Sequence, residues 1–171
     1  MAERFVHLKI RRQDGPDRPE SRRWEEFKVP FLPQMNVISA LQQIQLNPKT
    51  IDGKTVAPVV WDCSCLEEVC GACSMIINGR VRQACSALID SIAPNGEVIT
   101  IEPLSKFPLV RDLIVDRQRM FDALKKVRAW IEIDGTHELG AGPRESAEQQ
   151  EERYDLSRCM TCGCCVEACP Q

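Results

Sequence analysis

Ten cysteines, gathered in two groups, constrain the fold of this 171-residue chain more than any other feature. The later group follows the spacing C-x2-C-x2-C-x3-C-P, which is typical of bacterial iron–sulfur proteins. Three thiolates spaced in this way on a tight loop can converge on three corners of one cubic cluster, whereas the fourth points elsewhere and serves a second cluster. The cysteines of this group are Cys159, Cys162, Cys165 and Cys169.

The earlier group has the spacing C-x4-C-x2-C, followed by a fourth cysteine, which is typical of plant-type 2Fe-2S sites. The dipeptide Asn78-Gly79 predicts a type I′ hairpin that returns the fourth cysteine to the other three. Gly71 and Ala72 leave the backbone open, so their N–H groups can donate to cluster sulfurs. Ser64 and Ser74 are either further donors or ordinary polar loop residues. The cysteines of this group are Cys65, Cys70, Cys73 and Cys85.

Two cysteines, Cys63 and Cys164, fall outside both spacings, and we expect them to be free thiols that stay available for oxidation or as rescue ligands. Zinc is the rival metal, because the C-x2-C pairs at 70/73 and 159/162 could build a zinc ribbon. Each pair lies inside a longer iron–sulfur pattern, which favours iron and sulfide. Disulfides are disfavoured, since the sequence begins without the apolar block of an export signal.

Composition indicates a globular protein, with 43% hydrophobic and 27% charged residues. A net charge of -3 and an aromatic content of 5% disfavour a nucleic-acid surface. The sequence has no uninterrupted apolar run of about 18 residues, the length of a membrane span. We therefore expect a cytoplasmic chain that reaches a membrane only through a partner.

The first half predicts a small α+β unit, assigned to residues 1–105. A polar, arginine-rich loop is expected over Arg11–Arg23 and is interpreted as solvated, because its charges are interleaved. Asn36 is the expected N-cap of a helix that ends at Asn47-Pro48. Strands are expected over Phe5–Ile10, Trp24–Val29, Val56–Trp61, the two arms of the hairpin in Ser74–Gln83, and Glu97–Ile101.

The second half, residues 106–171, predicts a helical domain. The segment Glu102–Pro108 is the expected boundary, and from Leu109 apolar residues recur at helical intervals, most clearly over residues 117–129. A Gly/Pro-rich loop over Asp134–Pro143 and a charged helix over Glu145–Ser157 follow. The two histidines, His7 and His137, are isolated and are interpreted as structural, so no catalytic residue is expected.

This combination resembles the iron–sulfur subunits of succinate dehydrogenase and fumarate reductase, over essentially the whole chain. The resemblance implies a β-grasp, ferredoxin-like 2Fe-2S domain followed by an all-α, ferredoxin-type domain. It is carried by Pro33-Gln-Met-Asn-Val-Ile-Ser-Ala-Leu41, Trp61 with Cys65-Leu-Glu-Glu-Val-Cys-Gly-Ala-Cys-Ser-Met-Ile-Ile-Asn-Gly79, Phe107-Pro-Leu-Val-Arg-Asp-Leu113, Asp116-Arg-Gln-Arg-Met-Phe-Asp122 and Ser157-Arg-Cys-Met-Thr-Cys-Gly163.

The resemblance also implies ligands and partners. Cys65, Cys70, Cys73 and Cys85 would hold 2Fe-2S facing an FAD-carrying flavoprotein subunit that oxidises succinate. Cys159, Cys162 and Cys165 would bind three irons of a 4Fe-4S cluster, and Cys169 would ligate a 3Fe-4S cluster beside a cytochrome b membrane anchor, where quinone, expected to be menaquinone, is reduced. The subunit would then lie peripherally on the cytoplasmic face of the membrane. Family members continue past Cys169 and supply the remaining ligands there, so we expect this chain to be incomplete.

The expected function is electron transfer without substrate chemistry on this chain. A first cluster fed by succinate needs a potential above the value of about -400 mV of plant-type ferredoxins, so amide donation around Gly71–Ser74 is expected to raise it. Three alternatives stay open: a fumarate reductase subunit that works in the reverse direction, a free-standing two-cluster carrier, and a zinc-stapled interaction module.

Overall fold

The structure, a computed structural model, describes residues 4–130 and 144–171. The chain forms two compact units, one from Met1–Asp116 with Cys162–Gln171 and one from Arg117–Thr161. The predicted loop over Asp134–Pro143 and His137 lie outside the described residues. The domain boundary between residues 105 and 106 stays a prediction.

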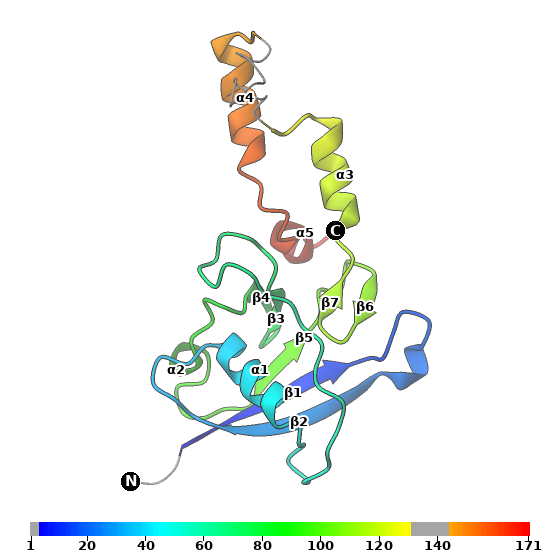
Figure 1. Cartoon of the computed structure of the whole chain (residues 1–171), viewed down its shortest axis with the longest axis vertical. Coiled ribbons are helices and arrows are strands. Elements are labelled where there is room, and N and C mark those ends of the chain that lie inside the picture. Colours follow the sequence, from blue (N-terminus) through cyan, green and yellow to red (C-terminus); the bar gives the residue numbers. More distant parts are fainter. Residues whose placement is uncertain (1–3, 131–143) are drawn as a thin grey trace, which may run out of the picture. The chain divides into compact units, whose positions relative to one another are not determined.

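A five-stranded mixed sheet organises the first unit, in the order β2-β1-β5-β3-β4. β1 and β2 form a long antiparallel pair, β5 runs parallel to β1 at the centre, and β3 pairs antiparallel with both β4 and β5 (Figure 1). This arrangement is the expected α+β fold of the β-grasp type. The strands predicted over Phe5–Ile10, Trp24–Val29 and Glu97–Ile101 are confirmed. The strands are β1 (Phe5–Arg12), β2 (Arg23–Pro30), β3 (Ser74–Ile77), β4 (Arg80–Gln83) and β5 (Ile99–Glu102).

Helix α1 (Val37–Leu46) lies across the sheet (Figure 1) and begins and ends where the sequence predicts. The Asn36 side-chain oxygen accepts a hydrogen bond of 2.9 Å from the Ser39 N–H, which caps the helix. One face of α1 is buried against the central strands, where Leu8 and Ile101 are fully buried. Each such aliphatic side chain stabilises the fold by about 1.5–3 kcal/mol.

The hairpin between β3 and β4 is confirmed. Asn78 and Gly79 both have positive φ, of 50° and 74°, as a type I′ turn requires. The Asn78 side-chain oxygen also accepts a 2.9 Å hydrogen bond from the Thr100 N–H, which fastens the turn to β5. The hairpin therefore carries the chain back to the residues that precede β3.

The strand predicted over Val56–Trp61 is wrong, because its backbone groups bond outside any ladder. Pro58 has no N–H to donate. The carbonyls of Ala57 and Pro58 accept from the Arg12 guanidinium, and the Val60 N–H donates to the Asp112 carboxylate over 3.0 Å. A buried ion pair thus replaces a neighbouring strand as the partner of this segment.

The helical interpretation is also wrong at its start. Residues from Leu109 form a short hairpin of β6 (Leu109–Arg111) and β7 (Ile114–Val115), with Asp112 at φ 47° between them. β-branched Val110, Ile114 and Val115 fit strands better than helices, so apolar spacing alone was misleading here.

Two further helices agree with the sequence. The pattern strongest over residues 117–129 corresponds to α3 (Gln118–Lys126), and the predicted charged helix corresponds to α4 (Ala147–Ser157). Ser146 caps α4 by accepting from the Gln149 N–H over 3.2 Å. The first unit also contains α2 (Ile89–Ile92), the 3-10 turn η1 (Pro19–Ser21) and α5 (Cys164–Ala168), which belongs to the C-terminal segment.

Candidate iron–sulfur sites

The loop that precedes β3 is folded so that its backbone N–H groups surround two cysteine sulfurs. Leu66, Glu68 and Gly71 all have positive φ, between 61° and 73°. Alternation of left-handed residues with their neighbours turns successive N–H groups to one side and makes a concave site for anions. For Leu66 and Glu68 this conformation is strained, so the loop is held in it by its surroundings.

Four N–H groups of this loop lie within hydrogen-bonding distance of sulfur. Those of Glu67 and Val69 each lie 3.4 Å from the Cys65 Sγ. The Cys70 Sγ receives the N–H groups of Cys65, at 3.5 Å, and of Ala72, at 3.4 Å. The donors at Glu67 and Val69 lower the pKa of Cys65 to about 7, because they stabilise its thiolate.

The other two cysteines of the early group meet at the base of the hairpin. Cys73 and Cys85 are buried, and they flank the antiparallel pair Ser74–Gln83 from β3 and β4. Burial raises the pKa of Cys73 to about 11, and the neighbouring Cys85 thiol adds to the rise. The Asn36 side-chain N–H donates to the Cys85 carbonyl over 2.9 Å, so the cap of α1 also positions this cysteine.

The donor set of this loop fits an iron–sulfur cluster. Four thiols come from one loop and one hairpin, and inward N–H groups can stabilise the negative charge of cluster sulfurs. Among residues 4–130 and 144–171, no three His, Cys, Asp or Glu side chains gather around a position for a single metal ion. A cluster spreads its thiolates over more than one iron, so the N–H groups and the thiols carry the fit.

Two serines and a fifth cysteine also lie at this site. The Ser74 hydroxyl donates to the Gly71 carbonyl over 2.9 Å rather than to a predicted ligand sulfur. Burial raises the pKa of Cys63, and the charges of Asp62 and of the neighbouring cysteines add to the rise. Cys63 therefore lies beside the early group, and its state as a free thiol stays a prediction, as does a donor role for Ser64.

The later cysteine group is divided between the two units. Cys159 lies exposed in the second unit, after α4. Cys162, Cys165 and Cys169 lie in the first unit, on or beside α5, and the last two are exposed. Their ligand roles stay predictions.

Cys164, which the spacing leaves over, points to the sheet of the first unit. Its Sγ lies 3.5 Å from the Gln83 Nε2 and 3.9 Å from the Ser74 Oγ. Burial raises its pKa to about 11, and the adjacent Cys162 thiol contributes. No sequence pattern pointed to this contact, since 81 residues separate Cys164 from Gln83.

The segment around α5 is fastened by two further contacts. The Glu167 carboxylate accepts from the Ser105 N–H, at 2.9 Å, the Ser105 hydroxyl, at 2.6 Å, and the Lys106 N–H, at 3.1 Å. Burial opposes ionisation, but these donors outweigh it and lower the pKa of Glu167. Gly163 has φ 80°, and an added Cβ there would lie 2.8 Å from the Phe107 ring, so only glycine fits.

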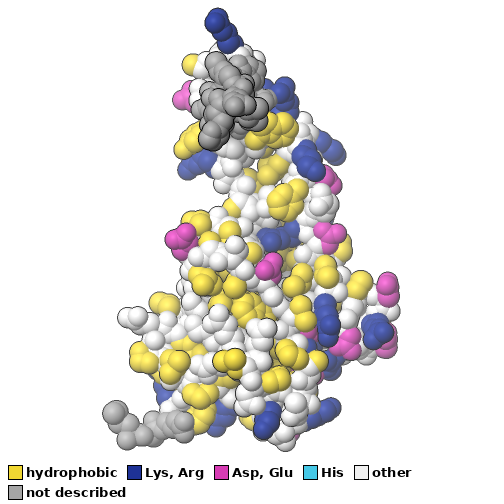
Figure 2. Space-filling model, viewed as in Figure 1, with side chains coloured by type: hydrophobic (Ala, Val, Ile, Leu, Met, Phe, Trp, Pro, Cys, Tyr) yellow, Lys and Arg dark blue, Asp and Glu magenta, His cyan; other side chains and the backbone are white. Residues whose placement is uncertain are grey.

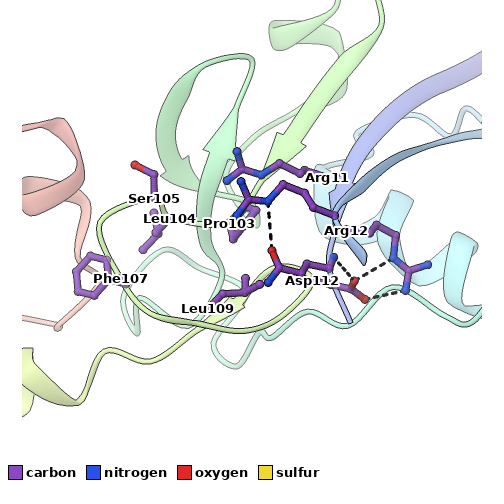
Figure 3. A pocket seen from close by; sticks show the side chains of 10 residues that line it. Arg11, Arg12, Pro103, Leu104, Ser105, Phe107, Leu109 and Asp112 are labelled. Carbon is purple, nitrogen blue, oxygen red and sulfur yellow. Dashed lines mark hydrogen bonds and ion pairs between the residues drawn. The ribbon is translucent and has the colours of Figure 1, made fainter. Parts of the chain in front are cut away.

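A buried ion pair holds the segment of chain that leads into the early cysteine loop. The Arg12 guanidinium is fully buried and donates to Asp112 over 3.1 and 2.7 Å (Figure 3). It also donates to Glu25 over 2.8 Å. The interpretation of Arg11–Arg23 as a solvated loop is therefore wrong for Arg12, which lies at the end of β1. A pocket of about 350 Å³ adjoins this pair, and its Arg11 is neutralised by Glu102 at 2.7 Å.

His7 Nε2 lies 2.9 Å from the carboxylate of Glu26, its diagonal neighbour on β2. Within residues 4–130 and 144–171, no helix combines the length and apolar character needed to cross a membrane.

Comparisons with known proteins agree with this geometry. A family described as "2Fe-2S iron-sulfur cluster binding domain" matches residues 7–122. The chain is 53% identical over 168 residues to the succinate dehydrogenase iron-sulfur subunit of Bacillus subtilis, covering 98% of this chain and 64% of the relative. It is 30% identical to the fumarate reductase iron-sulfur subunit of Wolinella succinogenes, covering 97% of this chain and 66% of the relative.

A solved structure shares the fold. A chain of the "Mycobacterium smegmatis Sdh1 complex in the apo form" superposes with a TM-score of 0.71 at 21% identity, covering 98% of this chain and 64% of that chain. The chain thus spans less than two thirds of the length of these proteins. It belongs to the family of 2Fe-2S iron–sulfur cluster binding domains, and the resemblance to iron–sulfur subunits of succinate dehydrogenase and fumarate reductase expected from its cysteine motifs is confirmed.

Proposed function

We propose that this chain is the electron-transfer subunit of a succinate dehydrogenase, carrying electrons from the FAD of a flavoprotein subunit through iron–sulfur clusters to quinone at a membrane anchor. The observation that carries the proposal is the cradle of N–H groups around Cys65 and Cys70. Such donors stabilise an added electron on a cluster and so raise its reduction potential. A potential above about -400 mV suits a cluster that succinate has to reduce.

We assign the first cluster, 2Fe-2S, to Cys65, Cys70, Cys73 and Cys85. When bound, it supplies one-electron chemistry at a fixed place. The chain itself orients the thiolates: the loop N–H groups support the first two, and the hairpin and the cap of α1 support the last two. No proton has to move for such a step.

We assign three irons of a 4Fe-4S cluster to Cys159, Cys162 and Cys165, and one ligand of a 3Fe-4S cluster to Cys169. The remaining ligands of both clusters are expected in the part of the relatives' length that this chain does not span. α5 and its contacts to Ser105 and Lys106 would hold two of the assigned cysteines at a fixed distance from the first group.

The loop of the first site also supplies a surface for the flavoprotein. Leu66 and Val69 are 52% and 61% exposed beside the proposed ligands. Hydrophobic side chains interrupt the polar surface at several places (Figure 2), and permanent interfaces between subunits are large and apolar. We propose that the flavoprotein covers this loop, which would bring its FAD near the first cluster.

The quinone end is assigned by relatedness alone. We propose a cytochrome b anchor, menaquinone as acceptor, and a peripheral position on the cytoplasmic face of the membrane. The alternative is a fumarate reductase subunit, which would carry electrons along the same clusters in the reverse direction. The similarity to a fumarate reductase iron-sulfur subunit supports this alternative.

The test is an anaerobic preparation of the chain with its flavoprotein and anchor subunits. Reduction by succinate, and then by dithionite, should give the electron paramagnetic resonance signal of a reduced 2Fe-2S cluster. Cys65→Ser should alter or abolish that signal, whereas Cys63→Ser should retain it. A colourless wild-type protein with no iron, or one with zinc in its place, would contradict the proposal.

A further inference from the structure

A chain of buried polar side chains runs from the early cysteine group to Cys164, within the segment that carries the later group. Gln83, the last residue of β4, is 4% exposed and lies opposite Ser74, the first residue of β3 and 5% exposed. The Gln83 Nε2 donates to the Ser74 Oγ over 2.8 Å. Polar side chains at such positions are costly to bury unless they are hydrogen-bonded. The remaining donors and acceptors of this pair therefore need partners of their own.

The Gln83 amide contacts one cysteine of the early group and also Cys164, which lies within the later motif but outside its spacing. Its Oε1 lies 3.5 Å from the Sγ of Cys73, a proposed ligand of the first cluster. Its Nε2 lies 3.5 Å from the Sγ of Cys164, which stands between the proposed ligands Cys162 and Cys165. One amide therefore spans from a sulfur of the early group to the segment of the later group.

With Cys73 as a thiol, its S–H donates to the amide oxygen. A cysteine that ligates iron has lost this proton, and an amide oxygen facing a thiolate would then be repelled. The oxygen and nitrogen of a glutamine occupy nearly equivalent positions, so a half-turn of the amide places its N–H on the sulfur.

The rest of the chain of contacts can follow this turn. The Ser74 hydroxyl, which donates to the Gly71 carbonyl over 2.9 Å, can rotate to donate to the amide oxygen. The Cys164 S–H, whose sulfur lies 3.9 Å from the Ser74 Oγ, then donates to this hydroxyl oxygen. In both arrangements Gln83, Ser74 and Cys164 thus have matched donors and acceptors.

We propose that Gln83 is a positioning residue whose amide N–H is held on the Cys73 sulfur by Ser74 and Cys164, so that it raises the reduction potential of the first cluster and links that cluster to the segment of the second. The inference rests on the proposed function of the early cysteine group. Reduction adds one electron to the cluster, and the amide keeps its proton throughout.

The experiment compares Gln83→Met with Gln13→Met in the anaerobically purified complex. Methionine matches glutamine in length but cannot donate, and Gln13 is a buried glutamine directly after β1 that donates to the Gly15 carbonyl. The midpoint potential of the 2Fe-2S signal is measured by redox titration. We expect Gln83→Met to weaken reduction about tenfold, a shift of about 59 mV to lower potential for a one-electron couple, and Gln13→Met to leave the potential in place.

A second pair tests the link. Cys164→Ala removes the donor to Ser74 and should lower the potential of the first cluster by part of the same shift. Cys164→Ser retains a donor and should restore it. If Cys164→Ala leaves the potential at the wild-type value while Gln83→Met lowers it, the link to the second segment is refuted.

A measurement on the wild-type protein tests the proposal even if the variants fail to assemble. Pulsed electron paramagnetic resonance of protein labelled with ¹⁵N in the glutamine side chain should show a weak nitrogen coupling to the reduced 2Fe-2S cluster. Loss of any 2Fe-2S signal in the wild type would refute the proposed function itself. A normal signal without glutamine coupling, or with an unchanged potential in Gln83→Met, would refute only the role of Gln83.

Discussion

Replacing Asp112 with asparagine isolates the contribution of the buried ion pair to the first unit. Asp112 has φ 47°, a conformation that asparagine adopts as readily as aspartate, so the backbone gains no strain. The carboxylate accepts from the Arg12 guanidinium twice, from the Gln13 N–H over 3.2 Å and from the Val60 N–H. Asparagine offers one acceptor atom in place of two and no charge.

The expected loss follows from burial. Arg12 and Asp112 side chains are both fully buried, so the substitution leaves a guanidinium in the interior that only Glu25 balances. Removing one partner of a buried pair costs roughly 3–5 kcal/mol. For a chain of this size that corresponds to a fall of about 6–20 °C in the midpoint of thermal unfolding.

Circular dichroism during heating measures this loss, with Asp90→Asn as the matched control. Asp90 pairs with Arg4 at 2.7 Å, but both side chains are about half exposed, and such surface pairs contribute only about 0–1 kcal/mol. Because Arg12 also holds the carbonyls of Ala57 and Pro58, the variant should in addition lose the 2Fe-2S signal at a lower temperature. Equal midpoints for the two variants would refute the reasoning.

Three further outcomes follow from local geometry. In cluster-free protein, Cys65 should be alkylated faster as pH rises through about 7, because its thiolate form grows over that range, and mass spectrometry should find it modified first. Gly163→Ala forces a Cβ against Phe107 at positive φ, so the 4Fe-4S signal should fall while the 2Fe-2S signal persists. Asn36→Ala removes the cap of α1 and the donor to Cys85, and should lower the free energy of unfolding by about 1–2 kcal/mol, measured by urea denaturation.

Sequence patterns predicted those parts of the molecule whose causes are local. The cap at Asn36, the turn at Asn78-Gly79 and the alternation of β1 each depend on residues a few positions apart, and all three are confirmed. The strand expected over Val56–Trp61 failed because its partner is a side-chain pair formed by residues 100 positions apart. Periodicity carries no information on such a contact.

The cysteine site shows the same division between local and distant causes. Spacing revealed the thiols and suggested that backbone N–H groups near Gly71 would donate, and Ala72 does donate to Cys70. The donors at Glu67 and Val69 went unseen, since they arise from positive φ at Leu66 and Glu68, residue types that rarely adopt it. Backbone strain of this kind cannot be predicted from the amino-acid sequence pattern.

Anchors independent of iron hold the later motif to the first unit. Gly163 fits against Phe107, Glu167 is bound by the N–H groups of Ser105 and Lys106, and Cys164 meets Gln83. None of these contacts uses a residue that we assign to a cluster. These contacts fix the first turn of α5 and its fourth residue. The entropy cost of ordering this segment is therefore met by folding rather than by cluster insertion. The first unit therefore preorganises Cys162, Cys165 and Cys169, and ordering of the segment should precede their occupancy.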